Sequence, residues 1–171
     1  DFYKDQQMSF LDDEERYRIN VFDWNSEFPQ IVKSGGFDAV IGNPPYGAML
    51  AELEASYLRG RFEATNKDLD TYSLFMEQAI RLCKPIGRVS MIVPTGWYSG
   101  AKFGHLRRFM ASVTDPESFV NLPYDIFKAW VDTTVFVVRK RLNRTDWPRP
   151  DACEARLRSF PKRHRITSAT E

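Results

Sequence analysis

Residues 37–47 read Phe-Asp-Ala-Val-Ile-Gly-Asn-Pro-Pro-Tyr-Gly, an apolar run that ends in a short polar and aromatic segment. The apolar residues of Phe37–Ile41 predict a buried strand of the kind that parallel sheets contain. Two prolines then end the strand, because proline has no N–H to donate to a neighbouring strand. We therefore expect Asn43 and Tyr46 to lie together at the carboxyl end of this strand.

The segment Asn43–Tyr46 combines two hydrogen-bond acceptors with an aromatic face. Asn43 has an amide oxygen, Pro44 has a backbone carbonyl, Pro45 stiffens the turn, and Tyr46 has a flat ring. This combination suits a planar group that bears an exocyclic NH2, such as a nucleobase. The alternative is that the prolines only end a strand and that Tyr46 packs against a neighbour. The strand, the amide and the ring follow one another in register, which favours a binding site.

Strands and helices alternate along the rest of the chain. The hydrophobic pattern predicts helices at about 26–33, 49–58, 71–83 and 101–112, and strands at 37–41, 88–93, 118–122 and 133–138. This alternation indicates an α/β fold with a mostly parallel sheet. The last two strands are separated by only about ten residues without a clear helix, so we expect an antiparallel strand at one edge.

The clearest helix begins near Thr71, because apolar side chains recur on one helical face. The residues of this predicted stripe are Tyr72, Phe75, Met76, Ala79, Ile80 and Cys83. Asp70 precedes the helix and is expected to cap it, and Lys84–Gly87 should end it.

Composition indicates a packed globular protein, with 171 residues of which 43% are hydrophobic and 14% aromatic. Two cysteines and two histidines without metal-type spacing argue against a disulfide framework or a zinc site. No apolar run is long enough for a membrane span, so we expect a cytoplasmic protein. The net charge is +1, yet residues 139–171 hold ten basic and four acidic residues. This charge surplus indicates a polyanion near the C-terminal end, and residues 143–171 are expected to be a basic linker or tail.

The Asn43–Tyr46 motif resembles the catalytic motif of amino-methyltransferases that use S-adenosylmethionine. More narrowly, the chain is similar to N6-adenine DNA methyltransferases of the fused type II restriction–modification kind. The segments that agree in order are Phe22–Trp24, Glu27–Pro29, Gly35–Gly47, Asp70–Glu77, Leu82–Gly87, Ile92–Trp97 and Leu106–Phe109. The resemblance covers residues 22 to about 140 and implies a Rossmann-like methyltransferase sheet.

The resemblance also implies roles for individual residues. The Asn43 side-chain oxygen and the Pro44 carbonyl would accept the two N–H groups of the adenine amine. Tyr46 would stack on the base after it leaves the duplex. Phe127 is a second stacking candidate, although it could equally be a core residue, and Trp97 and Trp130 are weaker candidates. Asp70 and Tyr72 would border the cofactor, and Asp23 occupies a position where some relatives hold an acid.

One family element is missing. The family binds S-adenosylmethionine with a glycine-rich loop after its first strand, and this chain contains no Gly-x-Gly sequence. We therefore expect residues 25–142 to be the catalytic half of a methyltransferase domain, preceded by a connecting segment at 1–24 and followed by the basic tail at 143–171. Such a fragment should bind S-adenosylmethionine weakly or not at all by itself and should be inactive alone.

The expected partners are double-stranded DNA and the missing N-terminal half and recognition domain of a parent protein. Two alternatives remain open from the sequence. A protein methyltransferase acting on glutamine N5 could use the same motif, because a planar amide presents its N–H groups in a similar way. A non-catalytic DNA-binding fragment is the other alternative.

Overall fold

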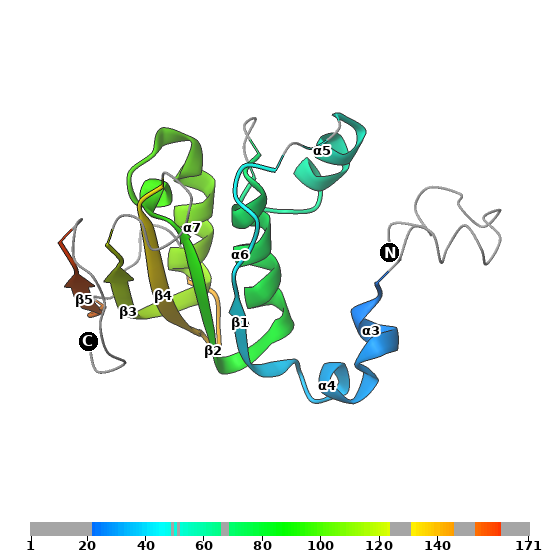
Figure 1. Ribbon diagram of the computed structural model, residues 1–171. Coiled ribbons are helices and arrows are strands. Elements are labelled where there is room, and N and C mark those ends of the chain that lie inside the picture. The colour runs from blue at the N-terminus through cyan, green and yellow to red at the C-terminus, as the bar shows by residue number, and fades with distance from the viewer. Residues whose placement is uncertain are drawn as a thin grey trace. The chain divides into compact units, whose positions relative to one another are not determined.

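The structure is a computed structural model that describes residues 22–48, 50, 52–65, 69–123, 131–145 and 153–161. The chain divides into two compact units, Asp1–Gly36 and Phe37–Glu171. Each unit is described by itself (Figure 1).

From residue 22 onward, the first unit contains two short helices, α3 (Trp24–Glu27) and α4 (Pro29–Lys33), where the sequence predicted one helix at about 26–33. The break falls at Phe28, which has φ −127° and ψ 55°. This residue precedes Pro29, and the proline ring disfavours helical geometry in the residue before it. Asp23 caps α3, since one carboxylate oxygen accepts the Asn25 N–H at 2.9 Å. This hydrogen bond, with others from the first turn, lowers the pKa of Asp23.

The second unit is built on a five-stranded sheet with the order β1-β2-β4-β3-β5 (Figure 1). Its strands are β1 (Phe37–Gly42), β2 (Cys83–Pro94), β3 (Thr114–Asn121), β4 (Thr133–Lys140) and β5 (Arg156–Ser159). The β1–β2 and β3–β5 pairs are parallel, and β4 pairs antiparallel with both β2 and β3. Four strands thus share one direction, which confirms the mostly parallel α/β fold. The antiparallel strand lies between β2 and β3 rather than at an edge.

Two helices form the core with this sheet, α6 (Thr71–Leu82) and α7 (Gly104–Val113). Their buried side chains and those of β2 and β4 form one cluster, whose fully buried members include Tyr72, Met76, Ile80, Leu106, Val89, Val93 and Phe136. The described part of this unit also includes helix α5 (Glu52–Arg59) and the 3-10 helices η2 (Thr95–Tyr98) and η3 (Ala101–Phe103). Across the part of the chain that is described, no helix is both long and apolar enough to cross a membrane.

Strand β1 was predicted to be buried, and the structure shows that it is not. Ile41 is 83% exposed, and Asp38 and Ala39 are also exposed, whereas Val40 packs against the core cluster. The reason is that the core covers one face of β1: Ala39 and Ile41 alternate with Val40 and project from the opposite face. An apolar run in the sequence therefore identified the strand but not how many of its faces are covered.

The basic C-terminal segment, expected to be a linker or tail, contains an additional strand. β5 pairs parallel with β3, with Ser118 opposite Arg156 and Asn121 opposite Ser159. All four residues of β5 are exposed. Its sequence, Arg-Leu-Arg-Ser, has only one apolar residue, which explains why the hydrophobic pattern did not predict it.

Gly87 lies where β2 passes close to β1. A Cβ at this position would come within 2.6 Å of Cys83 Sγ and 2.7 Å of the Asp38 backbone oxygen. A backbone oxygen cannot move aside as a flexible side chain can, so we expect Gly87→Ala to destabilise the protein by about 2 kcal/mol. The free energy of unfolding in urea measures this loss. Gly104→Ala is the matched control, because a Cβ there meets no atom within 4 Å and should not destabilise the protein.

Candidate active site

The polar and aromatic segments after β1 and β2 lie at the same edge of the sheet. The two strands are parallel neighbours, with Gly42 opposite Met91. The segment Asn43–Tyr46 follows β1, and η2 follows β2. In open α/β sheets, ligands bind beyond the carboxyl ends of such strands. The structure therefore brings the predicted motif to the expected position.

Asn43 and Tyr46 lie next to each other, as the motif predicted. Asn43 is exposed and Tyr46 is half-buried. The Tyr46 hydroxyl lies 3.1 Å from Asn43 Oδ1 and 3.0 Å from the backbone oxygen of Ile92 in β2. The Tyr46 ring meets the edge of the Tyr72 ring, with centroids 6.2 Å apart at 88°. Burial raises the pKa of Tyr46, so its hydroxyl keeps its proton at neutral pH.

The two proline carbonyls of the motif have different surroundings. The Pro45 carbonyl accepts a 2.9 Å hydrogen bond from Thr71 Oγ1. Among the described residues, none donates a hydrogen bond to the Pro44 carbonyl. Within the described part of the chain this carbonyl, on the buried Pro44, is therefore unpaired, and the neighbouring carbonyl anchors the loop to the start of α6.

Asp70 was predicted to cap α6, and this prediction is wrong for its side chain. Asp70 occupies the N-cap position, but its carboxylate makes no capping hydrogen bond. One oxygen accepts the Gly47 N–H at 3.3 Å, and the other pairs with Lys102 Nζ at 3.3 Å. Gly47 has φ +61°, a conformation that glycine adopts easily. The Asp70 carboxylate therefore holds the loop after Tyr46 against α6 and η3.

Tyr72, the second predicted cofactor residue, lies beneath the motif rather than at the surface. Its side chain is 2% exposed, and its ring packs beside Tyr46 and 5.4 Å from the Phe103 ring. Burial raises the pKa of the Tyr72 phenol. Its hydroxyl has no hydrogen-bond partner among the described residues. Phe75 was expected in the buried stripe and is instead 48% exposed, so that part of the stripe was wrong.

Trp97, one of the remaining aromatic candidates, does not join this group. Trp97 is 6% exposed and packs among Tyr98, Phe119 and Phe136, so it is a core residue. Phe127 and Trp130 lie outside the described residues.

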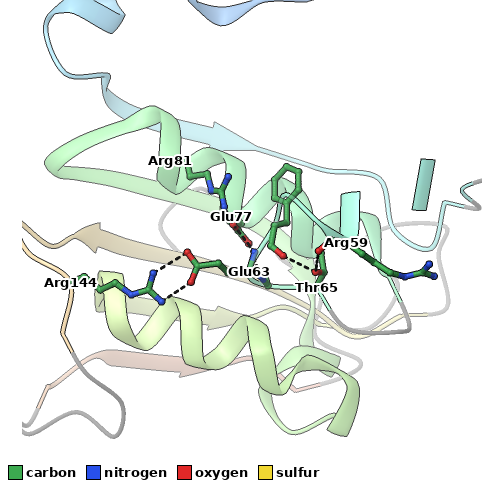
Figure 2. Close-up of polar contacts among 8 residues, drawn as sticks. Arg59, Glu63, Thr65, Glu77, Arg81 and Arg144 are labelled. Carbon is green, nitrogen blue, oxygen red and sulfur yellow. Dashed lines mark hydrogen bonds and ion pairs between the residues drawn. The ribbon is translucent and has the colours of Figure 1, made fainter. Parts of the chain in front are cut away.

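A buried carboxylate that the sequence did not identify supports the segment before α6. Glu77 is fully buried and accepts the N–H groups of Glu63 at 3.0 Å and Ala64 at 2.6 Å (Figure 2). Arg81 pairs with the same carboxylate one helical turn later. Only the Glu77–Arg81 spacing could have suggested it, and that spacing usually marks an exposed pair. Glu77 thus fixes the segment that leads from α5 towards α6.

Several basic residues near the C-terminus are already paired within the chain. Arg139 and Arg141 contact Asp115, and Arg144 forms a double hydrogen bond with Glu63 (Figure 2). Lys140 donates to the Cys83 carbonyl at 2.5 Å, near the end of α6. Arg156 and Arg158 are exposed on β5. Arg149, Lys162, Arg163 and Arg165 lie outside the described residues.

The described residues contain no group of three or more His, Cys, Asp or Glu side chains arranged to hold a metal ion. Beyond the end of β1, the described residues provide the Asn43 amide, the Pro44 carbonyl and the Tyr46 ring.

Two solved methyltransferase structures are similar in fold to this chain. A protein of Listeria monocytogenes described as a class I S-adenosylmethionine-dependent methyltransferase has a TM-score of 0.56 and 23% identity, over 73% of this chain and 37% of that one. The EcoKI M protein of a type I restriction enzyme has a TM-score of 0.53 and 20% identity, over 79% of this chain and 27% of that one. The chain thus has the fold of class I methyltransferases.

Comparison of the sequence with protein families identifies the family of this chain. Residues 1–127 match the model of the Eco57I restriction-modification methylase, and the chain belongs to this family. The type II restriction enzyme and methyltransferase Eco57I of Escherichia coli is 28% identical over 57% of this chain. The type II methyltransferase XhoI of Xanthomonas vasicola is 32% identical over 59% of it. The chain spans 10% and 17% of the lengths of these two relatives.

Proposed function

We propose that this chain is the catalytic portion of a site-specific DNA methyltransferase of a restriction–modification system, which methylates the exocyclic N6 of adenine. The observation that carries the proposal is the pair of acceptors beside Tyr46. The Asn43 amide is exposed and adjoins the Tyr46 hydroxyl, and the carbonyl of the buried Pro44 accepts no hydrogen bond from the described residues. The restriction–modification family of the chain supports DNA as the substrate over a protein glutamine.

The two acceptors would increase the nucleophilicity of the adenine amine. The lone pair of an adenine amine is delocalised into the ring, so the planar amine is a poor nucleophile. Hydrogen bonds from its two N–H groups to Asn43 and Pro44 would stabilise the pyramidal geometry that develops in the transition state. Tyr46 would stack on the base once it has left the duplex. No strong general base is needed before attack, because the proton leaves the cationic product.

The methyl donor would be S-adenosylmethionine, which supplies an electrophilic methyl group on a sulfonium. The described residues do not form a complete site for it. The sequence has no Gly-x-Gly loop, the Asp70 carboxylate already binds Gly47 and Lys102, and Tyr72 is buried. A cofactor role for Asp70 and Tyr72 therefore stays a proposal, in which other parts of the polypeptide hold most of the donor.

The proposed partners follow from the same reasoning. Double-stranded DNA in the cytoplasm would be the substrate, and the missing N-terminal half and a recognition domain would complete the enzyme. Arg156 and Arg158, which are exposed on β5, would approach phosphates. The 171 residues alone are expected to be inactive.

The test uses the longest native polypeptide that contains this chain. It is incubated with S-adenosylmethionine carrying a labelled methyl group and with duplex DNA of mixed sequence. We expect labelled N6-methyladenine in the nuclease digest, identified by mass spectrometry. Duplexes in which purine replaces adenine lack the amine and should accept no label. A label found only on cytosine, or only on a glutamine-containing peptide assayed in parallel, would contradict the proposal.

A further inference from the structure

The Tyr46 hydroxyl lies between two groups that each direct an oxygen towards it. Asn43 Oδ1 is 3.1 Å away, and the Ile92 backbone oxygen is 3.0 Å away. Ile92 follows Met91, whose pairing with Gly42 is the last between β1 and β2. The hydroxyl therefore joins the catalytic motif to the backbone of β2 just beyond the end of that strand pair.

One hydroxyl proton cannot serve two acceptors fully. The Ile92 backbone oxygen can only accept, and a tyrosine hydroxyl donates one proton and accepts through its lone pairs. An asparagine amide presents an oxygen on one side and an NH2 on the other, and a half turn exchanges them without changing the shape of the side chain. If Asn43 donates its NH2 to Tyr46 and Tyr46 donates to Ile92, every group is satisfied.

We propose that Tyr46 is a positioning residue whose hydroxyl holds the Asn43 amide in this orientation during methyl transfer. We call these three groups the Asn43–Tyr46–Ile92 relay. With its NH2 directed at Tyr46, Asn43 turns its oxygen to the other side of the amide, where the substrate amine would bind. In the opposite orientation the amide NH2 would face the substrate NH2, and two donors would oppose each other.

The relay rests on the proposed function, because it assumes that the group bound at Asn43 is an amine. The relay assigns separate roles to the ring and to the hydroxyl of Tyr46, which the sequence motif does not distinguish. The ring provides a stacking surface, and the hydroxyl orients a neighbouring side chain. Removing only the hydroxyl should therefore affect the rate of transfer and not the binding of the base.

The first test is Tyr46→Phe in the native polypeptide, assayed with duplex DNA. We expect kcat to fall about tenfold, which corresponds to one ordinary hydrogen bond, while KM for DNA changes less than twofold. A rise in KM without a fall in kcat would overturn the relay, because it would assign the hydroxyl to substrate binding.

The second test repeats Tyr46→Phe in an Asn43→Asp background. A carboxylate has acceptors on both sides and no orientation to select, so the added loss should be less than twofold. An equal tenfold loss in both backgrounds would overturn the relay and indicate a general packing effect.

The third test does not depend on methyl transfer. Neutron diffraction from crystals of the wild-type polypeptide with adenine should show the Tyr46 hydroxyl deuterium directed at the Ile92 oxygen and two deuteriums on the Asn43 atom that faces Tyr46. A hydroxyl deuterium directed at Asn43 would overturn the relay. If the wild-type enzyme leaves DNA unmethylated, the proposed function fails, and the neutron measurement still decides the relay.

Discussion

Asn43→Ala is expected to lower kcat for DNA methylation by about a thousandfold while the Kd for duplex DNA changes less than about threefold. The amide oxygen would contact the amine most strongly when positive charge develops on it, so its loss should raise the barrier rather than weaken binding. Losing one such preorganised group typically costs about a hundred- to a thousandfold in rate. Single-turnover kinetics with labelled methyl donor and a fluorescence anisotropy titration measure the two quantities.

Asn121→Ala is the matched control for this variant. Asn121 ends β3, and its Oδ1 lies 3.1 Å from the Tyr98 hydroxyl, so it repeats the Asn–Tyr contact outside the proposed site. We expect Asn121→Ala to change kcat less than threefold. Similar losses in the two variants, or a Kd for DNA that rises as much as kcat falls, would remove Asn43 from its proposed role.

Glu77→Ala is expected to destabilise the protein by about 3 kcal/mol. The substitution leaves the backbone N–H groups of Glu63 and Ala64 without their acceptor and removes the partner of Arg81. Leaving a buried donor unsatisfied costs about 1–3 kcal/mol. Urea unfolding of wild type and variant, followed by circular dichroism, measures the difference in free energy of unfolding.

Glu63→Ala is the control, because Glu63 also pairs with an arginine but does so at the surface. The side chains of Glu63 and Arg144 are 47% and 53% exposed. Exposed ion pairs contribute about 1 kcal/mol or less, so this variant should unfold at nearly the wild-type urea concentration. If both substitutions destabilise equally, the burial of Glu77 is not the source of its effect.

Local sequence patterns predicted the elements of this fold because each pattern has a local cause. The spacing of Tyr72, Met76, Ala79 and Ile80 identified α6, and the run Phe37–Ile41 identified β1. The same reasoning could not show which faces are covered. Phe75 continues the helical spacing and Ile41 continues the apolar run, yet both are exposed. Burial depends on which elements pack together, and that information is not local.

The sequence predicted the site most accurately for contacts between residues that are close together along the chain. Asn43 and Tyr46 meet because they are three residues apart on one tight segment. The contacts of Asp70 with Gly47 and Lys102 join residues 23 and 32 positions apart, and helix-capping statistics cannot predict them. The Asp70 carboxylate could cap α6 or contact residues distant in sequence, and in the folded chain it contacts Gly47 and Lys102. The catalytic roles of Asn43, Pro44, Pro45 and Tyr46 stay predictions.

The placement of β4 has a consequence for how this chain is made. β2 and β3 do not pair with each other, since β4 lies between them and pairs with both. During translation the ribosome must therefore release residues up to Lys140 before the middle of the sheet can close. Until then the inner edges of β2 and β3 are open to wrong pairing, so a pause in synthesis before residue 133 should favour aggregation of the nascent protein.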